Sequence, residues 1–353
     1  MDRRGFLKSS GAAAALASTA AGADTATPAA SGIPSRAGVG PTARHLRLAV
    51  APGYDLAGFG AERLAQRLEV ATAGRYRIAL SSGAAESDLS FGDAHRHVAL
   101  HPGFAFFAGL PLRQGLSATD LDGWLALGGG QLLWDELAHP FGLKPLLVGH
   151  TGLSPGLWSN VRLAAASDFR GVPVVAPDLA ARVLQLLGAE TVNVPPQDLK
   201  AALATGRVHM AEWTGPLPAA SFDLRPLAQC LYQPGLTPGG AVTLTVARRL
   251  WDDLTPADRA VFEACAAEEH RLALAEARLH AALAAGIGAE AKWPVQQALP
   301  PALEPALAAA AGAVIEEVAG HDAISRRIAA SYRAHREVYG GHGPWRALDR
   351  PGR

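Results

Sequence analysis

This 353-residue sequence lacks an excess of charge of either sign. It has 32 Lys and Arg against 32 Asp and Glu, so its formal net charge at pH 7 is zero. Affinity for nucleic acid depends on excess positive charge, and we therefore expect no nucleic-acid partner. After residue 23 the chain also lacks an apolar run as long as the roughly 20 residues of a transmembrane helix. With 18% charged and 49% hydrophobic residues, the composition indicates a protein with an ordinary buried core.

The first residues have the pattern of an export signal. Arg3-Arg4 is followed by Gly5-Phe6-Leu7-Lys8, then by an Ala-rich stretch and by an A-x-A cleavage site at Ala21-Gly22-Ala23. This order predicts a signal peptide over residues 1–23, and the paired arginines assign it to the twin-arginine (Tat) pathway. Residues 24–43, rich in Ala, Thr, Pro, Ser and Gly, predict a disordered leader. We therefore expect the protein to work in the periplasm.

Cysteine is scarce, with Cys230 and Cys265 as the two examples. The periplasm permits disulfide formation. Cys230 falls on a predicted strand and Cys265 within a long predicted helix, so spacing alone does not bring them together. A disulfide and two separate buried thiols therefore both stay open.

Hydrophobic periodicity predicts an α/β protein, and a mature chain about twice the usual domain length favours two lobes. Strands are expected at 45–50, 76–80, 143–148, 172–176, 191–194, 208–213 and 241–246. Helices are expected at 56–69, 119–139, 179–188, 196–205, 255–285, 301–319 and 323–338. The strand-helix-strand-helix-strand order between 172 and 213 is typical of a parallel layer. Thr255 as N-cap and Pro256 as the first helical residue predict the start of the long helix.

Four stretches resemble one protein family. They are Phe104 to Gly130, Asp168 to Ala189, Leu199 to Pro216 and Tyr232 to Gly235, with the similarity strongest at Glu212-Trp213-Thr214-Gly215-Pro216. Their order and spacing are similar to those of the periplasmic solute-binding proteins of TRAP transporters, especially the branch that binds α-keto acids. The resemblance covers nearly all of the mature chain.

The resemblance implies a two-lobed periplasmic-binding-protein fold (type II-like) with a helical C-terminal region. Its lobes would close on a small organic solute, an organic acid or related compound, and pass it to TRAP membrane subunits without catalysis or a cofactor. It places lobe I at 44–145 and lobe II at 146–238. A return strand and long helices that pack across both lobes would occupy 239–340, and a tail 341–353. Glu212 and Trp213 correspond to pocket residues of the family.

The pocket departs from the family pattern where the ligand carboxylate should be held. The clamping arginine of the family corresponds to Val175, which cannot make the paired charge-assisted bonds of a guanidinium. Two metal-binding positions of the keto-acid branch correspond to Ser154 and Pro238, so we expect no metal. Arg96 and His150 are candidate substitutes for the clamp. His95, Ser154, Trp158 and Val175 complete the candidate ligand-binding set with Glu212 and Trp213.

Alternative functions stay open. Gly152-Leu153-Ser154-Pro155-Gly156 fits the nucleophile elbow of an exported hydrolase, although Pro155 lacks the N–H that the oxyanion hole needs. Asp93, His95, His97 and His101 could form a zinc site of a metalloenzyme. An orphan sensor or a decayed paralogue is a third alternative. The chain stops soon after Tyr339, where the keto-acid branch carries a dimer-forming helix, so we expect a monomer.

Overall fold

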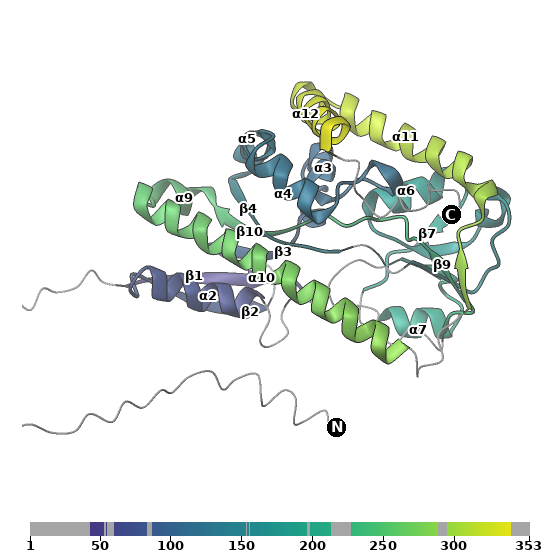
Figure 1. Ribbon diagram of the computed structural model, residues 1–353, viewed down its shortest axis with the longest axis horizontal. Helices are drawn as coiled ribbons and strands as arrows, with labels where there is room; N and C mark the ends of the chain where they lie inside the picture. Colours follow the sequence, from purple (N-terminus) through teal and green to yellow (C-terminus); the bar gives the residue numbers. More distant parts are fainter. Residues whose placement is uncertain are drawn as a thin grey trace, which may run out of the picture. The chain divides into compact units, whose positions relative to one another are not determined.

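The computed structural model describes residues 43–52, 54, 60–82, 87–152, 154, 156–195, 198–212, 227–288 and 295–339 (Figure 1). The predicted signal peptide, the predicted leader up to residue 42, Trp213 and the predicted tail lie outside these residues. Within the part of the chain that the structure describes, every helix is too short or too polar to cross a bilayer.

The first sheet has five strands in the order β2-β1-β3-β10-β4. They are β1 (Arg44–Val50), β2 (Tyr76–Ser82), β3 (Leu89–Asp93), β4 (Leu143–His150) and β10 (Ala241–Ala247). β1 pairs in parallel with β2 and β3, while β10 runs antiparallel between β3 and β4. The predicted return strand after residue 239 is therefore present. Because β4 ends at His150, this sheet extends beyond the boundary expected at residue 145.

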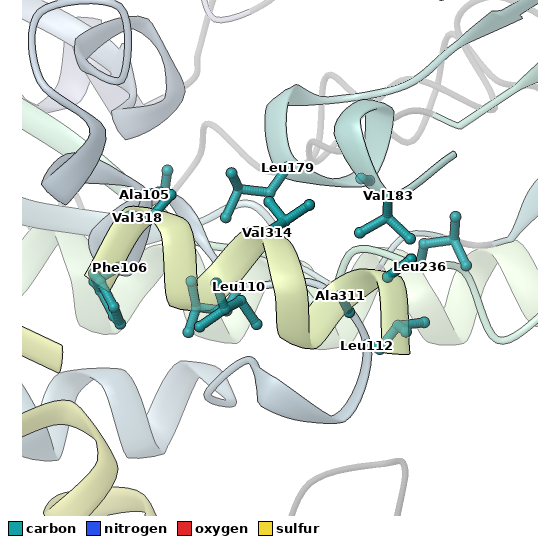
Figure 2. Close-up of a cluster of buried hydrophobic side chains, with 14 of the residues drawn as sticks. Ala105, Phe106, Leu110, Leu112, Leu179, Val183, Leu236, Ala311, Val314 and Val318 are labelled. Atoms are coloured by element: carbon teal, nitrogen blue, oxygen red, sulfur yellow. The ribbon is translucent and has the colours of Figure 1, made fainter. Parts of the chain in front are cut away.

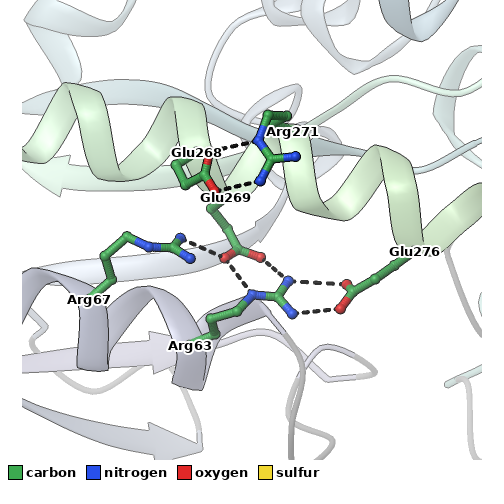
Figure 3. Close-up of polar contacts among 6 residues, drawn as sticks. All are labelled: Arg63, Arg67, Glu268, Glu269, Arg271 and Glu276. Atoms are coloured by element: carbon green, nitrogen blue, oxygen red, sulfur yellow. Dashed lines mark hydrogen bonds and ion pairs between the residues drawn. The ribbon is translucent and has the colours of Figure 1, made fainter. Parts of the chain in front are cut away.

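Helices α2 (Gly60–Ala71) and α10 (Pro256–Gly288) cover one face of the first sheet, and their apolar side chains share a core with β1, β3, β4 and β10. Arg63 of α2 ties the two helices together (Figure 3). It donates to both oxygens of Glu269, at 2.5 and 2.9 Å, and to Glu276, at 2.5 and 3.0 Å. The short helix α9 (Arg248–Asp253) leads from β10 into α10.

The second sheet has six strands in the order β11-β9-β5-β8-β6-β7. They are β5 (Leu157–Ser159), β6 (Pro173–Val175), β7 (Glu190–Thr191), β8 (Met210–Ala211), β9 (Cys230–Gln233) and β11 (Val295–Ala298). β6 pairs in parallel with β7 and β8, and the helices α6 (Asp178–Leu186) and α7 (Leu199–Ala204) connect these strands. The predicted parallel strand-helix-strand-helix-strand unit is thereby confirmed. The edge strand β11 was not predicted.

The helix expected over 119–139 is wrong as a single element. The chain forms α4 (Ala118–Ala126) and α5 (Gly130–Ala138), and Gly129 between them has a positive φ of 80°. α4 ends at Ala126 with Leu127 as its C-cap, and the left-handed Gly129 is the N-cap of α5, so in the structure the apolar residues on the two sides do not share one helical phase. In the second of these helices Leu132 is exposed, whereas Trp134 is fully buried.

The C-terminal helices α11 (Glu304–Gly320) and α12 (Ala323–Tyr339) match the predicted ranges closely. Figure 2 shows α11 packed between the segment of η2 (Pro102–Phe104) and α3 (Ala105–Ala108) on one side and α6 on the other. Phe106, Leu179 and Val314 belong to the same buried cluster. α12 in turn packs on α4 and α5, which lie between β3 and β4 of the first sheet in the sequence. α11 packs on α6, which lies between β6 and β7 of the second sheet. The two C-terminal helices therefore contact connecting helices of both sheets.

The two cysteines are separate buried thiols rather than a disulfide. Cys230 lies on β9 of the second sheet, in the large core shared with α11. Cys265 lies in α10, in the core of the first sheet.

Candidate functional site

A hollow of ≈ 550 Å³ lies where the carboxyl ends of strands from both sheets meet. From the first sheet it is lined by residues that follow β3, and from the second by residues that follow β6 and β7. The lining consists of Asp93, His95, Val175, Ala176, Pro177, Asp178, Ala181, Thr191, Val192, Asn193, Val194 and Pro195. Open α/β sheets bind ligands beyond the carboxyl ends of their strands, so this hollow is the candidate solute site.

His95 and Val175, two of the predicted site residues, line this hollow together. His95 lies in the short helix η1 (Ala94–His97) directly after β3. Val175 ends β6 and is 8% exposed, so its methyl groups form part of the wall. The position that the family resemblance assigns to a clamping arginine is therefore placed at the hollow, but with an apolar side chain.

Asp178, which also lines the hollow, forms a hydrogen bond with His95. As the first residue of α6, it accepts a hydrogen bond from Nδ1 of His95 at 2.7 Å. Burial of the ring lowers the pKa of His95, but the hydrogen bond from Asp178 and the charges of Asp178 and Asp93 outweigh it, and the pKa is raised above its ordinary value. Sequence reasoning missed Asp178. Its one signal was an acidic residue in the first turn of a helix that directly follows a predicted strand.

Glu212 does not line this hollow. Its carboxylate is fully buried where the chain crosses between the sheets, and Oε1 accepts the backbone N–H of Thr237 at 2.7 Å. Burial raises the pKa of Glu212 to about 7, although hydrogen bonds from Thr237 and Ser154 oppose the shift. Gly235 makes room for this cluster, since a Cβ there would lie 2.5 Å from Oγ of Ser154. Glu212 and Ser154 are thus together, as part of the crossover.

His150 lies at the same crossover, at the end of β4. Its Nδ1 accepts the backbone N–H of Gly152 at 3.0 Å. Burial, together with the nearby His270, lowers the pKa of His150 to about 4, so the ring is neutral at pH 7. A neutral imidazole provides no positive charge for a carboxylate.

Arg96 and Trp158 also lie away from the hollow. Nη2 of Arg96 donates to Oγ of Ser90 at 2.6 Å, and burial lowers the pKa of the guanidinium. Its Nη1 lies close to Gly92, near the end of β3. Trp158 is fully buried on β5, in a cluster with Val175 and Leu231. Its side chain packs behind the wall of the hollow.

The histidines considered for a zinc site point to three different partners. His95 bonds Asp178, His97 packs on Phe104 with ring centroids 5.4 Å apart, and His101 bonds Asp322 at 3.1 Å. Among the residues that the structure describes, no three His, Cys, Asp or Glu side chains are grouped as metal ligands. The proposed zinc cluster is therefore not assembled.

The nucleophile-elbow hypothesis for Ser154 also lacks its structural context. The elbow requires a helix directly after the serine, but the strand β5 begins at Leu157. The Ser154 hydroxyl instead lies 3.3 Å from both the N–H and the carbonyl oxygen of Gly156.

Comparison with known proteins finds relatives in sequence and in fold. No protein-family model matches the chain. A monocarboxylate 2-oxoacid-binding periplasmic protein of Nostoc sp. is 27% identical over 224 residues, which cover 59% of this chain and 61% of the relative. The match thus spans about three fifths of that protein's length.

Solved structures decide the fold. A TRAP periplasmic solute-binding protein of Colwellia psychrerythraea, with bound calcium and pyruvate, superposes with a TM-score of 0.79 at 18% identity, over 87% of this chain and 99% of that one. The fold is that of the TRAP periplasmic solute-binding proteins. A TRAP transporter solute-binding protein of Bordetella bronchiseptica, a dimer with calcium and picolinate, gives 0.77 at 22% identity, over 87% and 96% of the chains. The two-lobed TRAP-type fold expected from the sequence is confirmed, and these relatives are solute receptors rather than enzymes.

Proposed function

We propose that this TRAP-type chain is an extracytoplasmic receptor that captures a small organic solute between its lobes and passes it to TRAP membrane subunits. The observation that carries the proposal is the hollow at the carboxyl ends of β3, β6 and β7, because it takes its walls from both sheets. Closing two lobes around a solute is the common response of periplasmic binding proteins. No reaction is assigned, since the residues considered for catalysis are separated or lack their helix.

The chemistry of the relatives supports a small organic acid or related compound as the solute. The Nostoc protein is a 2-oxoacid-binding protein, and the Colwellia and Bordetella proteins hold pyruvate and picolinate. The hollow of ≈ 550 Å³ has room for molecules of that size. In this proposal His95 and Val175 contact the solute, and Trp213, which lies outside the described residues, stays a candidate from the sequence alone.

Calcium does not fit the residues at the positions that correspond to the metal ligands of the keto-acid branch. Ca²⁺ takes six to eight oxygen ligands. Ser154 offers one hydroxyl, Pro238 offers no side-chain oxygen, and the Glu212 carboxylate, whose buried Oε2 has no partner among the described residues, would add at most two oxygens, which is fewer than Ca²⁺ requires. We therefore propose a solute site without a bridging metal.

The place of action follows from the relatives, which are periplasmic proteins. We propose that Arg3-Arg4 directs export by the Tat route and that the receptor is a monomer. The same proposal places the first segment of lobe I at 44–150 and the first segment of lobe II at 151–240. These ranges differ from the boundaries expected from the sequence because β4 of the first sheet continues to His150.

Thermal unfolding with a panel of solutes tests the proposal. A ligand that binds only the folded protein stabilises it by about 2.7 kcal/mol at a hundredfold excess over Kd. We expect at least one of pyruvate, picolinate and malonate to raise the midpoint by several degrees. Absence of any shift across these acids and across neutral solutes of similar size would contradict a receptor function. Stoichiometric, tightly held zinc in the isolated protein would favour the metalloenzyme alternative instead.

A further inference from the structure

The side chains of His95 and Asp178 join elements that belong to different sheets. His95 follows β3 of the first sheet, and Asp178 follows β6 of the second. Both residues line the hollow, and their 2.7 Å hydrogen bond links the two lobes there. The His95 side chain is 16% exposed and that of Asp178 37%, so the bond is shielded on the histidine side and open to solvent on the other.

We propose that Asp178 is a closure latch for His95, so that closing the lobes takes up a proton from solvent and solute capture becomes pH-dependent. The proposal rests on lobe closure as the mode of capture. Asp178 acts on the solute through His95 and is therefore a positioning residue. When Nδ1 donates to Asp178 and the ring is protonated, Nε2 carries the second N–H of an imidazolium. That nitrogen is buried and has no hydrogen-bond partner among the described residues.

The charged groups around His95 favour the protonated ring. Asp178 and Asp93 both raise its pKa. Of its neighbours in η1, Arg96 is directed to Ser90, and His97 is neutral because burial lowers its pKa to about 4. On the opposing helix, Arg182 lies one turn after Asp178 and forms an ion pair with Glu317 of α11.

The direction of the pH dependence follows from the raised pKa of His95 in the bridged state. With the lobes apart, His95 would titrate near its ordinary value of 6.5. The bridge therefore contributes its full stabilisation to the closed state below about pH 6.5. That contribution is lost as pH rises through the raised pKa of the bridged histidine, so closure and capture weaken toward alkaline pH.

Titration of the His95 ring by NMR tests the electrostatic part. In the full mature chain we expect the Asp178→Asn substitution to lower the pKa of His95, because it removes the hydrogen bond and the charge that raise it. The matched control is Asp322→Asn, which alters the comparable pair of His101 and Asp322 away from the hollow and keeps a capping side chain for Ser325. It should leave the pKa of His95 unchanged. An equal His95 pKa in wild type and Asp178→Asn would overturn the latch.

A distance measurement tests the mechanical part. Spin labels at Val70→Cys in α2 and Leu186→Cys in α6 report on the two lobes, because both positions are exposed while Cys230 and Cys265 are buried. We expect the distance distribution to shift toward longer values between pH 5.5 and pH 8.5, and the shift to vanish in Asp178→Asn. A pH response that persists in that variant would also overturn the latch. If Asp178→Asn does not fold, His95→Gln removes the same bridge from the other side and should abolish the shift.

These outcomes separate the latch from the proposed function. If the pKa and the distance respond as expected but pyruvate, picolinate and malonate all fail to shift the melting midpoint, the receptor proposal fails and the latch stands. If a solute binds with the same pH dependence in wild type and in Asp178→Asn, the receptor stands and the latch fails.

Discussion

The carboxylate of Glu212 accepts the backbone N–H of Thr237 at 2.7 Å, and this bond joins the end of β8 to the segment that returns toward β10. The same crossover holds Ser154, Gly235 and His150. Glu212 and Ser154 lie together near Gly235, while His150 and Gly152 lie near Gly239 in the same crossover. If one lobe moves relative to the other, the backbone of this crossover has to change conformation.

Glu212 should make stability fall as pH rises. Its pKa in the folded protein, about 7, lies above the ordinary 4.5, so the folded state holds a proton that the unfolded state has released. Stability is therefore full below about pH 4.5 and declines through pH 7, by about 3 kcal/mol. Urea unfolding of Glu212→Gln should match wild type near pH 4 and exceed it at pH 8. Parallel pH curves for the two proteins would show that Glu212 is ionised in the fold.

Gly239 should tolerate no side chain. Its φ is +98°, and a Cβ there would lie 2.3 Å from the carbonyl oxygen of Gly152 and 2.6 Å from Cε1 of His150. Gly142 has a similar φ of +69° with no atom within 4 Å of such a Cβ, and it serves as the control. We expect Gly142→Ala to lose about 1 kcal/mol from strain and Gly239→Ala about 3 kcal/mol or more, measured by urea unfolding. Equal losses would mean that the crossover has room to relax.

Arg63 should contribute more to the free energy of unfolding than an exposed arginine such as Arg271. Glu269 is 1% exposed and would keep only the weaker 3.4 Å contact with Arg67 after Arg63→Ala (Figure 3). Removing one partner of a buried ion pair costs about 3–5 kcal/mol, and partial exposure of Arg63 places the expected loss near 2–3 kcal/mol. The control Arg271→Ala breaks an exposed pair with Glu268 and should cost less than about 0.5 kcal/mol. Equal melting shifts would contradict this difference.

Val175 is the position where a carboxylate clamp can be restored. A guanidinium there would reach the hollow that Val175 now lines and could bind a carboxylate through two parallel bonds. We expect Val175→Arg to bind pyruvate at least about tenfold more tightly than wild type, as measured by titration calorimetry. Val175→Met is the matched uncharged control and should show no gain. A folded Val175→Arg protein with unchanged affinity would place the carboxylate elsewhere.

Helices and strands that are marked by a cap residue or a hydrophobic pattern within their own sequence could be predicted. Thr255 caps α10 as expected, with its Oγ accepting the N–H of Asp258 at 3.1 Å. The strands β1, β2, β4, β6 and β10 and both C-terminal helices were predicted within a few residues, whereas β3 and β5 were not predicted. β11 was missed because Val295–Ala298 is a short and mostly exposed strand without alternation, and only its distant partner β9 defines it. The break at Gly129 was missed because the apolar residues on both sides continue a helical pattern.

Some residues of the predicted ligand-binding set line the hollow, and their contact with a solute stays a prediction. The resemblance placed Val175 and His95 near the solute, and both line the hollow. It could not reveal Asp178, because the bond between His95 and Asp178 joins residues 83 positions apart and depends on how the two lobes meet. Glu212, which the resemblance grouped with the pocket, does not line this hollow, and its carboxylate is buried in the crossover.

Titration calorimetry with pyruvate, picolinate and malonate on a protein with a filled hollow tests the central claim most directly. Ala181 lies in α6 and lines the hollow, whereas Ala204 in α7 is exposed outside it, so Ala181→Trp and Ala204→Trp form a matched pair. The account predicts saturable one-to-one binding of at least one acid to wild type and to Ala204→Trp, and its loss in a folded Ala181→Trp protein. Undiminished binding to Ala181→Trp would contradict the assignment of the solute to this hollow.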